Sequence, residues 1–283
     1  MHFTESDIRR NASAAGYLPV AAEDVRGFAA PSLAGTPVFS LPDVLRSADA
    51  PEARICKDRP KVRAVCVGGL FLKQYRIRGW WKLFRYRFRL PRPLRGLQAA
   101  FALKAARIAT PKVLLALRGQ AHDGVRNDWL VTAALPESTL FADRAAREKG
   151  AAGVDALIGE ITPVVAVMHA AGIEHGDLNL RNLYRIPGAM APGTLLHWGV
   201  IDLDGVRIGG EPVAGSRRCR ETARLATSIW LALPPEEQQK TSWEEVLERC
   251  AVHYEDHAGV SLSRRRLRRF ARRLLTHDPR REE

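Results

Sequence analysis

The alternation of hydrophobic and polar positions predicts a small antiparallel sheet in the first half of the chain. Residues 61–67 are rich in β-branched side chains, Gly68-Gly69 is a tight-turn signal, and residues 70–75 form the returning strand. Residues 1–48 are rich in Ala, Pro and Gly and have no strong period, so we expect a loosely packed or partly ordered extension there.

The pattern becomes helical in the second half. Residues 164–168 form an apolar helical stretch, and Gly172 is placed to end that helix. Two short strands follow at residues 183–186 and 195–203, and residues 261–275 carry an approximate helical stripe of leucines among arginines. A sheet-rich first part and a helix-rich second part predict an α+β fold.

Length and composition fit one globular chain with a sizeable core, because 46% of the 283 residues are hydrophobic. No run approaches the roughly 20 apolar residues of a membrane-spanning helix, and no secretory signal is visible at the start. The four cysteines have no metal-ligand spacing. We therefore expect a cytoplasmic protein with no transmembrane segment.

The positive charge is concentrated in one stretch. The formal net charge is +13, and residues 74–122 contain twelve Lys or Arg and no acid. Within it, residues 76–95 interleave basic with aromatic side chains, which suits an anionic membrane surface. Nucleic acid also fits such a stretch, but no nucleic-acid-binding module is visible, so we rank it well below a membrane. The plain structural alternative is a solvated helix face with its aromatic residues buried.

The candidate chemistry lies in His175-Gly176-Asp177 and the residues after it. Asn182 lies five residues after Asp177, and Asp202 ends an apolar run about twenty residues further on. Asp177 can accept the proton of an acceptor hydroxyl or orient that hydroxyl, and Asn182 and Asp202 offer hard oxygen ligands to Mg²⁺. This order is typical of the catalytic loop and metal-binding Asp of kinase-like enzymes. The alternative is a turn whose Asp and Asn side chains cap their own backbone; the flanking helix and strands favour catalysis.

A phosphate-binding lysine is expected upstream, and Lys73 lies on the strand predicted over residues 70–75. A solvated strand lysine is the alternative. No glycine-rich phosphate loop is visible, so Lys57 and Lys61 would cover the phosphates instead. Kinases usually hold this lysine with a glutamate on the next helix, but the helix expected at about residues 94–107 offers only Gln98.

These motifs resemble those of bacterial lipopolysaccharide kinases that phosphorylate inner-core sugars, the 3-deoxy-D-manno-octulosonic acid (Kdo) kinase and heptose kinase group. The resemblance covers about residues 50–230, and it is carried mainly by residues 55–60, 71–76, 109–113, 168–179, 200–204 and 217–225. It implies a two-lobed protein-kinase-like fold, with the extension at 1–48, an N-lobe and hinge at 49–135 and a C-lobe at 136–283.

The resemblance also implies a set of site residues and the cofactors ATP and Mg²⁺. Asn179 takes the place where protein kinases usually carry a lysine. The implied catalytic residues are Asp177, Asn179 and His175, the metal ligands are Asn182 and Asp202, and the nucleotide-binding residues are Lys73, Gln98, Lys57, Lys61, Thr132, Ala133 and Leu135.

The function expected from this set is ATP-dependent phosphorylation of a Kdo or heptose hydroxyl on a lipopolysaccharide precursor glycolipid. The enzyme would act peripherally at the inner face of the inner membrane. Two alternatives stay open: a kinase-like enzyme with another small-molecule or protein acceptor, and a pseudokinase scaffold that binds membranes or acidic partners. The missing helix glutamate favours the scaffold, whereas the intact Asp177, Asn182 and Asp202 favour an enzyme.

Overall fold

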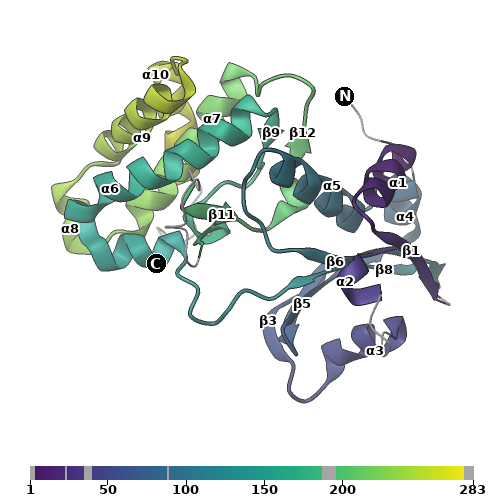
Figure 1. Ribbon diagram of the computed structural model, residues 1–283. Helices are drawn as coiled ribbons and strands as arrows, with labels where there is room; N and C mark the ends of the chain where they lie inside the picture. Colours follow the sequence, from purple (N-terminus) through teal and green to yellow (C-terminus); the bar gives the residue numbers. More distant parts are fainter. Residues whose placement is uncertain (1–3, 23, 35–39, 88, 187–195, 277–283) are drawn as a thin grey trace. The chain divides into compact units, whose positions relative to one another are not determined.

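The structure is a computed structural model that divides into two compact units (Figure 1). It describes residues 4–22, 24–34, 40–87, 89–186 and 196–276. Unit 1 comprises Met1–Phe101 and Pro111–Pro136, and unit 2 comprises Ala102–Thr110 and Glu137–Glu283. The protein has the expected α+β composition, because unit 1 carries the large sheet and unit 2 most of the long helices.

Unit 1 is built on an antiparallel sheet with the strand order β1-β2-β6-β8-β5-β4-β3, and β7 pairs with β8. The hairpin predicted around Gly68-Gly69 is present, and β5 lies between β4 and β8, with Leu72 buried opposite Val131. The strands are β1 (Leu18–Ala22), β2 (Val25–Ala29), β3 (Arg54–Arg59), β4 (Val62–Val67), β5 (Leu70–Arg78), β6 (Val113–Gly119), β7 (Ala121–His122) and β8 (Val125–Ala133).

The expectation of a loosely packed extension over residues 1–48 is wrong for the described residues. Helix α1 (Glu5–Ala14) begins at a capping box and buries Ile8 and Ala12, while β1 and β2 extend the sheet. Gly27 is needed on β2, because a Cβ there would clash with the backbone of β6. These strands are five residues long, too short to give a clear period in the sequence. The helices α2 (Pro31–Ala34) and α3 (Leu41–Arg46) and the 3₁₀ turn η1 (Ser47–Asp49) follow.

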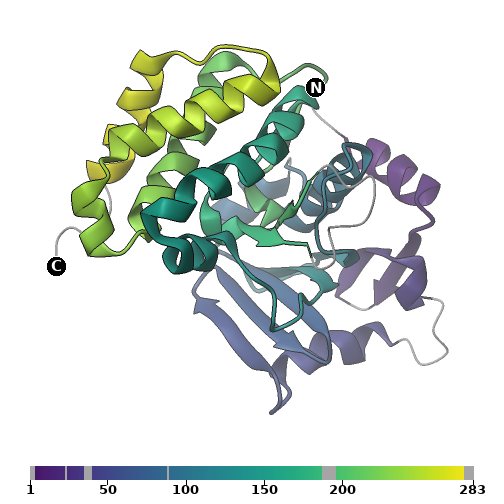
Figure 2. The ribbon, with the colours of Figure 1, turned by 60° about the vertical axis from the view of Figure 1, so that its left-hand side comes forward.

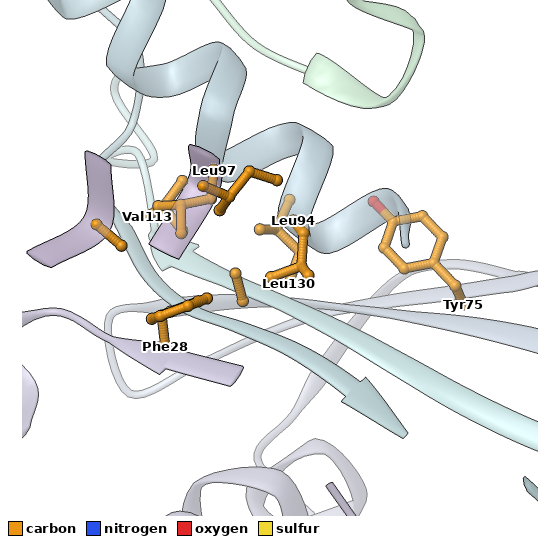
Figure 3. Close-up of a cluster of buried hydrophobic side chains, with 9 residues drawn as sticks. Phe28, Tyr75, Leu94, Leu97, Val113 and Leu130 are labelled. Atoms are coloured by element: carbon orange, nitrogen blue, oxygen red, sulfur yellow. The ribbon is translucent and has the colours of Figure 1, made fainter. Parts of the chain in front are cut away.

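Two further helices, α4 (Trp80–Arg87) and α5 (Arg92–Ala105), lie between β5 and β6 in the sequence. Helix α5 packs on the sheet through a buried apolar cluster that includes Tyr75 of β5 (Figure 3). The labelled members of the cluster are Phe28, Tyr75, Leu94, Leu97, Val113 and Leu130.

Unit 2 consists of helices that pack on one another and two small antiparallel sheets (Figure 2). The helices are α6 (Ala142–Ala170), α7 (Gly215–Ala232), α8 (Pro235–Lys240), α9 (Trp243–Ala258) and α10 (Arg264–Thr276). One sheet pairs β10 (Leu183–Arg185) with β11 (Trp198–Val200), and the other pairs β9 (Ile173–Glu174) with β12 (Arg207–Ile208). The 3₁₀ turns are η2 (Leu180–Asn182) and η3 (Leu203–Gly205).

The longest helix, α6, is broken at Gly150 and forms part of the core of unit 2. Its segment Gly153–Ala170 is long and apolar enough to cross a membrane by length and composition, but 56% of it is buried. It packs against α7 and α9, as a core helix does. Gly172 follows with φ +72° and its N–H donates to the carbonyl of His169 at 3.2 Å, so the predicted helix end is confirmed.

Helix α10 forms where the arginine-rich terminal helix was predicted. Its apolar stripe is buried at Leu267, Ala271 and Leu275, and the helix packs on α7 and α9. Its arginines at positions 265, 268 and 272 lie on the exposed side. The helical stripe expected over residues 261–275 is therefore the face that packs on unit 2.

Candidate active site

The loop that follows β9 is held by a buried histidine. The ring of His175 is fully buried, and its Nε2 lies 2.9 Å from the carbonyl oxygen of Ile201. A carbonyl only accepts, so Nε2 carries the hydrogen. Since Ile201 directly precedes Asp202, His175 fixes the end of β11. This contact positions the loop, and the catalytic role that the resemblance implies for His175 stays a prediction.

Asn182 connects Asp177 with the segment that carries Asp202. Its Nδ2 donates to the backbone carbonyl of Asp177 at 2.8 Å, and its own carbonyl accepts from the N–H of Ile201 at 2.9 Å. The backbone segments that carry Asp177, Asn182 and Asp202 therefore lie next to one another in unit 2. Because the amide nitrogen of Asn182 is engaged, its Oδ1 is the atom suited to bind a cation.

Asp202 adopts a left-handed backbone conformation, with φ 60° and ψ 63°, directly before η3. Such a conformation costs a residue other than glycine about 1–3 kcal/mol and is concentrated at functional sites. The regular pairing of β11 with β10 ends at Val200, opposite Leu183. The strained residue therefore stands where the strand gives way to the loop, as the sequence predicts for a metal-binding Asp.

The carboxylate of Asp177 is 60% exposed and is oriented by an arginine of α7. Its Oδ1 accepts from Nη1 of Arg224 at 2.6 Å, and the same nitrogen donates to the carbonyl of Gly176 at 2.9 Å. Among the described residues, Oδ2 has no hydrogen bond, which leaves it for an acceptor hydroxyl. Asn179 donates to the carbonyl of Asp177 at 2.9 Å and accepts from the N–H of Arg181, so it shapes the loop.

Glu221 of α7 holds the backbone of the loop, a role that the sequence did not predict. Its carboxylate accepts from the N–H groups of His175 at 2.8 Å and Gly176 at 2.5 Å, and it lies 3.1 Å from Nε2 of His169. Burial by itself would raise the pKa of Glu221, but the hydrogen bond and charge of His169 and the backbone N–H of His175 outweigh it and lower that pKa. A charged carboxylate thus holds two backbone donors in place.

Gly176 is required by the backbone of the loop. Its φ is +82°, and a Cβ would clash with the carbonyl oxygen of Gly205. No other residue fits there without movement of η3. The close approach of Gly205 therefore excludes any side chain immediately before Asp177.

A cleft of about 550 Å³ lies beside Asp177 within unit 2. Its walls come from α6, the catalytic loop, α7 and α10, and they carry three arginines and two aspartates. The lining residues are Asp143, Arg147, Asp177, Asn179, Leu180, Arg181, Arg224, Thr227, Ser228, Leu231, Ala232 and Leu274. Polar and charged groups around an exposed acid suit a hydrophilic acceptor.

The expected phosphate-binding residues lie in unit 1. Lys73 is on β5, opposite Ala64 of β4 and Leu130 of β8, and its Nζ lies 5.6 Å from the ring centre of Tyr75. Lys57 is on the exposed strand β3, next to an irregularity of the β3–β4 pairing, and Lys61 is in the turn that joins these strands.

The other predicted nucleotide-binding residues lie on β8 and α5. Gln98 is buried on α5, and its Oε1 accepts from Nδ2 of Asn11 at 3.2 Å. Thr132 and Ala133 end β8, where the N–H of Ala133 donates to the carbonyl of Lys112, and Leu135 follows the strand. The nucleotide-binding roles of these residues stay predictions.

The oxygen donors in unit 2 suit Mg²⁺ better than a transition metal. In the described part of the chain, no group of three or more His, Cys, Asp or Glu side chains could hold a metal ion. Asn182 and Asp202 offer an amide and a carboxylate oxygen, and Mg²⁺ is usually held by one or two such groups together with substrate phosphates. The residues therefore fit the expected ion.

Comparison with solved structures bears on the fold of the chain. The structure of WaaP in complex with acyl carrier protein matches with a TM-score of 0.51 and 18% identity, over 83% of this chain and 89% of that one. Glucosamine kinase in complex with glucosamine, ADP and inorganic phosphate matches at 15% identity, over 77% of this chain and 72% of that one, with a TM-score of 0.48 that is too low to carry an argument. A search of curated proteins finds no match.

The fold and the loop define a phosphotransferase of the protein-kinase-like class. The sequence model of the lipopolysaccharide kinase (Kdo/WaaP) family matches residues 58–214, which is more than half of the chain. The protein belongs to this family and is an ATP-dependent kinase, as the sequence predicts. Family membership thus favours the enzyme over the scaffold.

Proposed function

We propose that this kinase phosphorylates a sugar hydroxyl of the lipopolysaccharide inner core, on Kdo or heptose, at the cytoplasmic face of the inner membrane. The observation that carries the proposal is the cleft of about 550 Å³ beside Asp177. It has room for a sugar, and Arg147, Arg181 and Arg224 on its walls suit an acceptor that carries carboxylate or phosphate groups.

In this proposal Asp177 acts on the acceptor. One oxygen is held by Arg224, and the other accepts the proton of the attacking hydroxyl or orients that hydroxyl. Arg224 keeps the carboxylate in one orientation, and Asn179 keeps the loop in shape.

Asn182 and Asp202 would hold Mg²⁺, which neutralises charge on the triphosphate when it is bound. Lys73 would bind nucleotide phosphates, and Lys57 and Lys61 would add positive charge to them. Gln98 lies on the helix where kinases usually carry the glutamate that holds this lysine, and its amide would take that place. Thr132, Ala133 and Leu135 would meet the adenine.

The test is phosphate transfer from ATP to Kdo-lipid A by Asp177→Asn, whose isosteric amide cannot take a proton. Transfer is expected to fall about 10²- to 10⁴-fold, with an unchanged melting temperature because the side chain is mostly exposed. The control is Asp256→Asn, which changes an exposed residue of α9 and should keep full activity.

Unchanged transfer by Asp177→Asn would overturn the catalytic assignment. Wild-type turnover of ATP that occurs with other alcohols but never with Kdo-lipid A or its heptosylated form would instead favour another acceptor.

A further inference from the structure

A second hollow, of about 330 Å³, lies entirely within unit 1. It is bounded by the β3–β4 turn, the end of β5, α4 and the start of α5. The lining residues are Pro60, Lys61, Tyr75, Arg76, Ile77, Arg78, Lys82, Arg85, Tyr86, Arg89, Arg92 and Asp128. It shares only Lys61 with the predicted nucleotide-binding residues.

The hollow has a large excess of positive charge. Seven of its lining residues are Lys or Arg and one is an acid. That acid, Asp128, is buried in an ion pair with Arg126, and Arg76 is paired with Asp58. The other six cations have no ion pair with any residue that the structure describes: Arg92 lies over the ring of Tyr75, and the remaining five are Lys61, Arg78, Lys82, Arg85 and Arg89. Converging cations without internal partners attract an anion, and guanidinium groups suit phosphate in particular.

Next to these cations, α4 exposes large aromatic side chains. Trp80 is 76% exposed, Trp81 70% and Phe84 57%, and the rings of Trp81 and Phe84 stack with centroids 6.0 Å apart. The structural alternative from the sequence, with aromatic residues buried under a basic helix face, is therefore wrong for these three. Exposed aromatic residues grouped on one short helix mark an interaction surface.

Helix α10 is a useful comparison, because it is also rich in arginine but does not expose its apolar residues in this way. Both helices are rich in arginine, yet α10 buries Leu267, Ala271 and Leu275 against unit 2. Helix α4 leaves Trp80, Trp81 and Phe84 exposed. Tryptophan and lysine or arginine together are typical of the interface between lipid headgroups and acyl chains.

We propose that α4 and the cationic hollow form a membrane-docking site, in which the hollow takes the phosphate of an anionic lipid headgroup and the aromatic side chains enter the interfacial layer. The docking site rests on the membrane location in the proposed function, and it specifies the surface that meets the membrane. It does not depend on which sugar is phosphorylated. Soluble phosphates would use the cations but not the aromatic residues, so both features together select a bilayer.

The experiment measures binding to phosphatidylcholine vesicles with and without phosphatidylglycerol. Wild-type protein is expected to bind the anionic vesicles only. The triple variant Lys82→Glu, Arg85→Glu, Arg89→Glu should bind them about 100-fold or more weakly, because each lost cation is worth about fivefold at an anionic surface. The matched control is Arg265→Glu, Arg268→Glu, Arg272→Glu on α10, which makes the same change in net charge and should keep most of the binding.

Two further measurements separate the lipid from other anions. Vesicles with brominated acyl chains should quench the tryptophan fluorescence of wild type, and Trp80→Ser, Trp81→Ser should remove most of that quenching. Glycerol phosphate and a short single-stranded DNA should compete weakly. Thermal melting of each variant shows whether it is folded, and Asp177→Asn should bind vesicles like wild type, so a failure of catalysis is distinguishable.

Three results would overturn the proposal. The first is equal loss of binding in the α10 control, which would mean that net charge alone drives it. The second is unaltered vesicle binding in both the folded triple variant and the folded tryptophan variant. The third is full competition by glycerol phosphate or DNA without acyl-chain quenching, which would make the hollow a site for soluble phosphate or nucleic acid.

Discussion

The catalytic loop of unit 2 and helix α4 of unit 1 differ in whether their functional groups have partners within the chain. In the loop, Glu221, Asn182 and Arg224 hold the backbone of residues 175–182 through short hydrogen bonds. On α4 the large aromatic side chains are exposed, and Lys82 and Arg85 have no ion pair with a described residue. Chemistry needs fixed geometry, which internal partners supply. A docking surface keeps its binding groups for a partner outside the chain.

The largest effect on stability is expected from Gly176→Ala, compared with Gly79→Ala just before α4. Both glycines have positive φ, at +82° and +94°, so alanine costs each about 1–2 kcal/mol. Only at Gly176 would the Cβ also meet backbone, that of Gly205, whereas nothing lies within 4 Å at Gly79. Gly176→Ala should therefore lose about 3 kcal/mol or more of unfolding free energy in urea.

The same two variants also test whether activity depends on the geometry of the catalytic loop and not on that of α4. Gly176→Ala is expected to lose activity, because a shift of the loop moves Asp177, and Gly79→Ala should keep it. Equal losses of stability in the two variants would contradict the close packing of the loop against η3.

A smaller effect is expected from Glu221→Gln, compared with Lys82→Gln on α4. The amide places an N–H₂ group against backbone donors and removes a charged acceptor, so unfolding free energy should fall by about 2 kcal/mol. Lys82 is exposed, and its neutralisation should change stability by less than about 0.5 kcal/mol.

The pH dependence gives an independent check on Glu221. Its pKa is lowered by folding, so the stability it contributes is present above pH 4.5, its ordinary value, and is lost as pH falls through the lowered pKa. The difference between wild type and Glu221→Gln should therefore shrink in acid. A difference that grows as pH falls would show that the carboxylate is not held in its charged form.

The sequence predicts the site best where chemistry fixes both residue type and spacing. Asp177, Asn182 and Asp202 are recognisable because the loop and the strand that carry them are short and close in the chain. Glu221 and Arg224 are missed, because they lie more than 40 residues further on and act through backbone contacts that leave no local pattern. The nearest signal is the run of residues 217–225, which the family resemblance includes without a role.

The fold was less predictable where tertiary packing decides. The sequence does not show that β1 and β2 join the large sheet, because β2 pairs with β6, about 90 residues away, and β1 joins through β2. It also does not distinguish α4 from α10, since both combine arginines with large apolar residues. The apolar residues of α10 are buried and the tryptophans of α4 are exposed because the two helices have different neighbours in the fold.

The most direct test of the central claim is calorimetric titration of ATP with and without Mg²⁺ into wild type, Asp202→Asn and the control Asp256→Asn. If Asn182 and Asp202 share one ion with the triphosphate, Mg²⁺ should tighten ATP binding by about tenfold or more in wild type and in the control. The gain should largely disappear in Asp202→Asn. A full Mg²⁺ effect in folded Asp202→Asn would contradict the account.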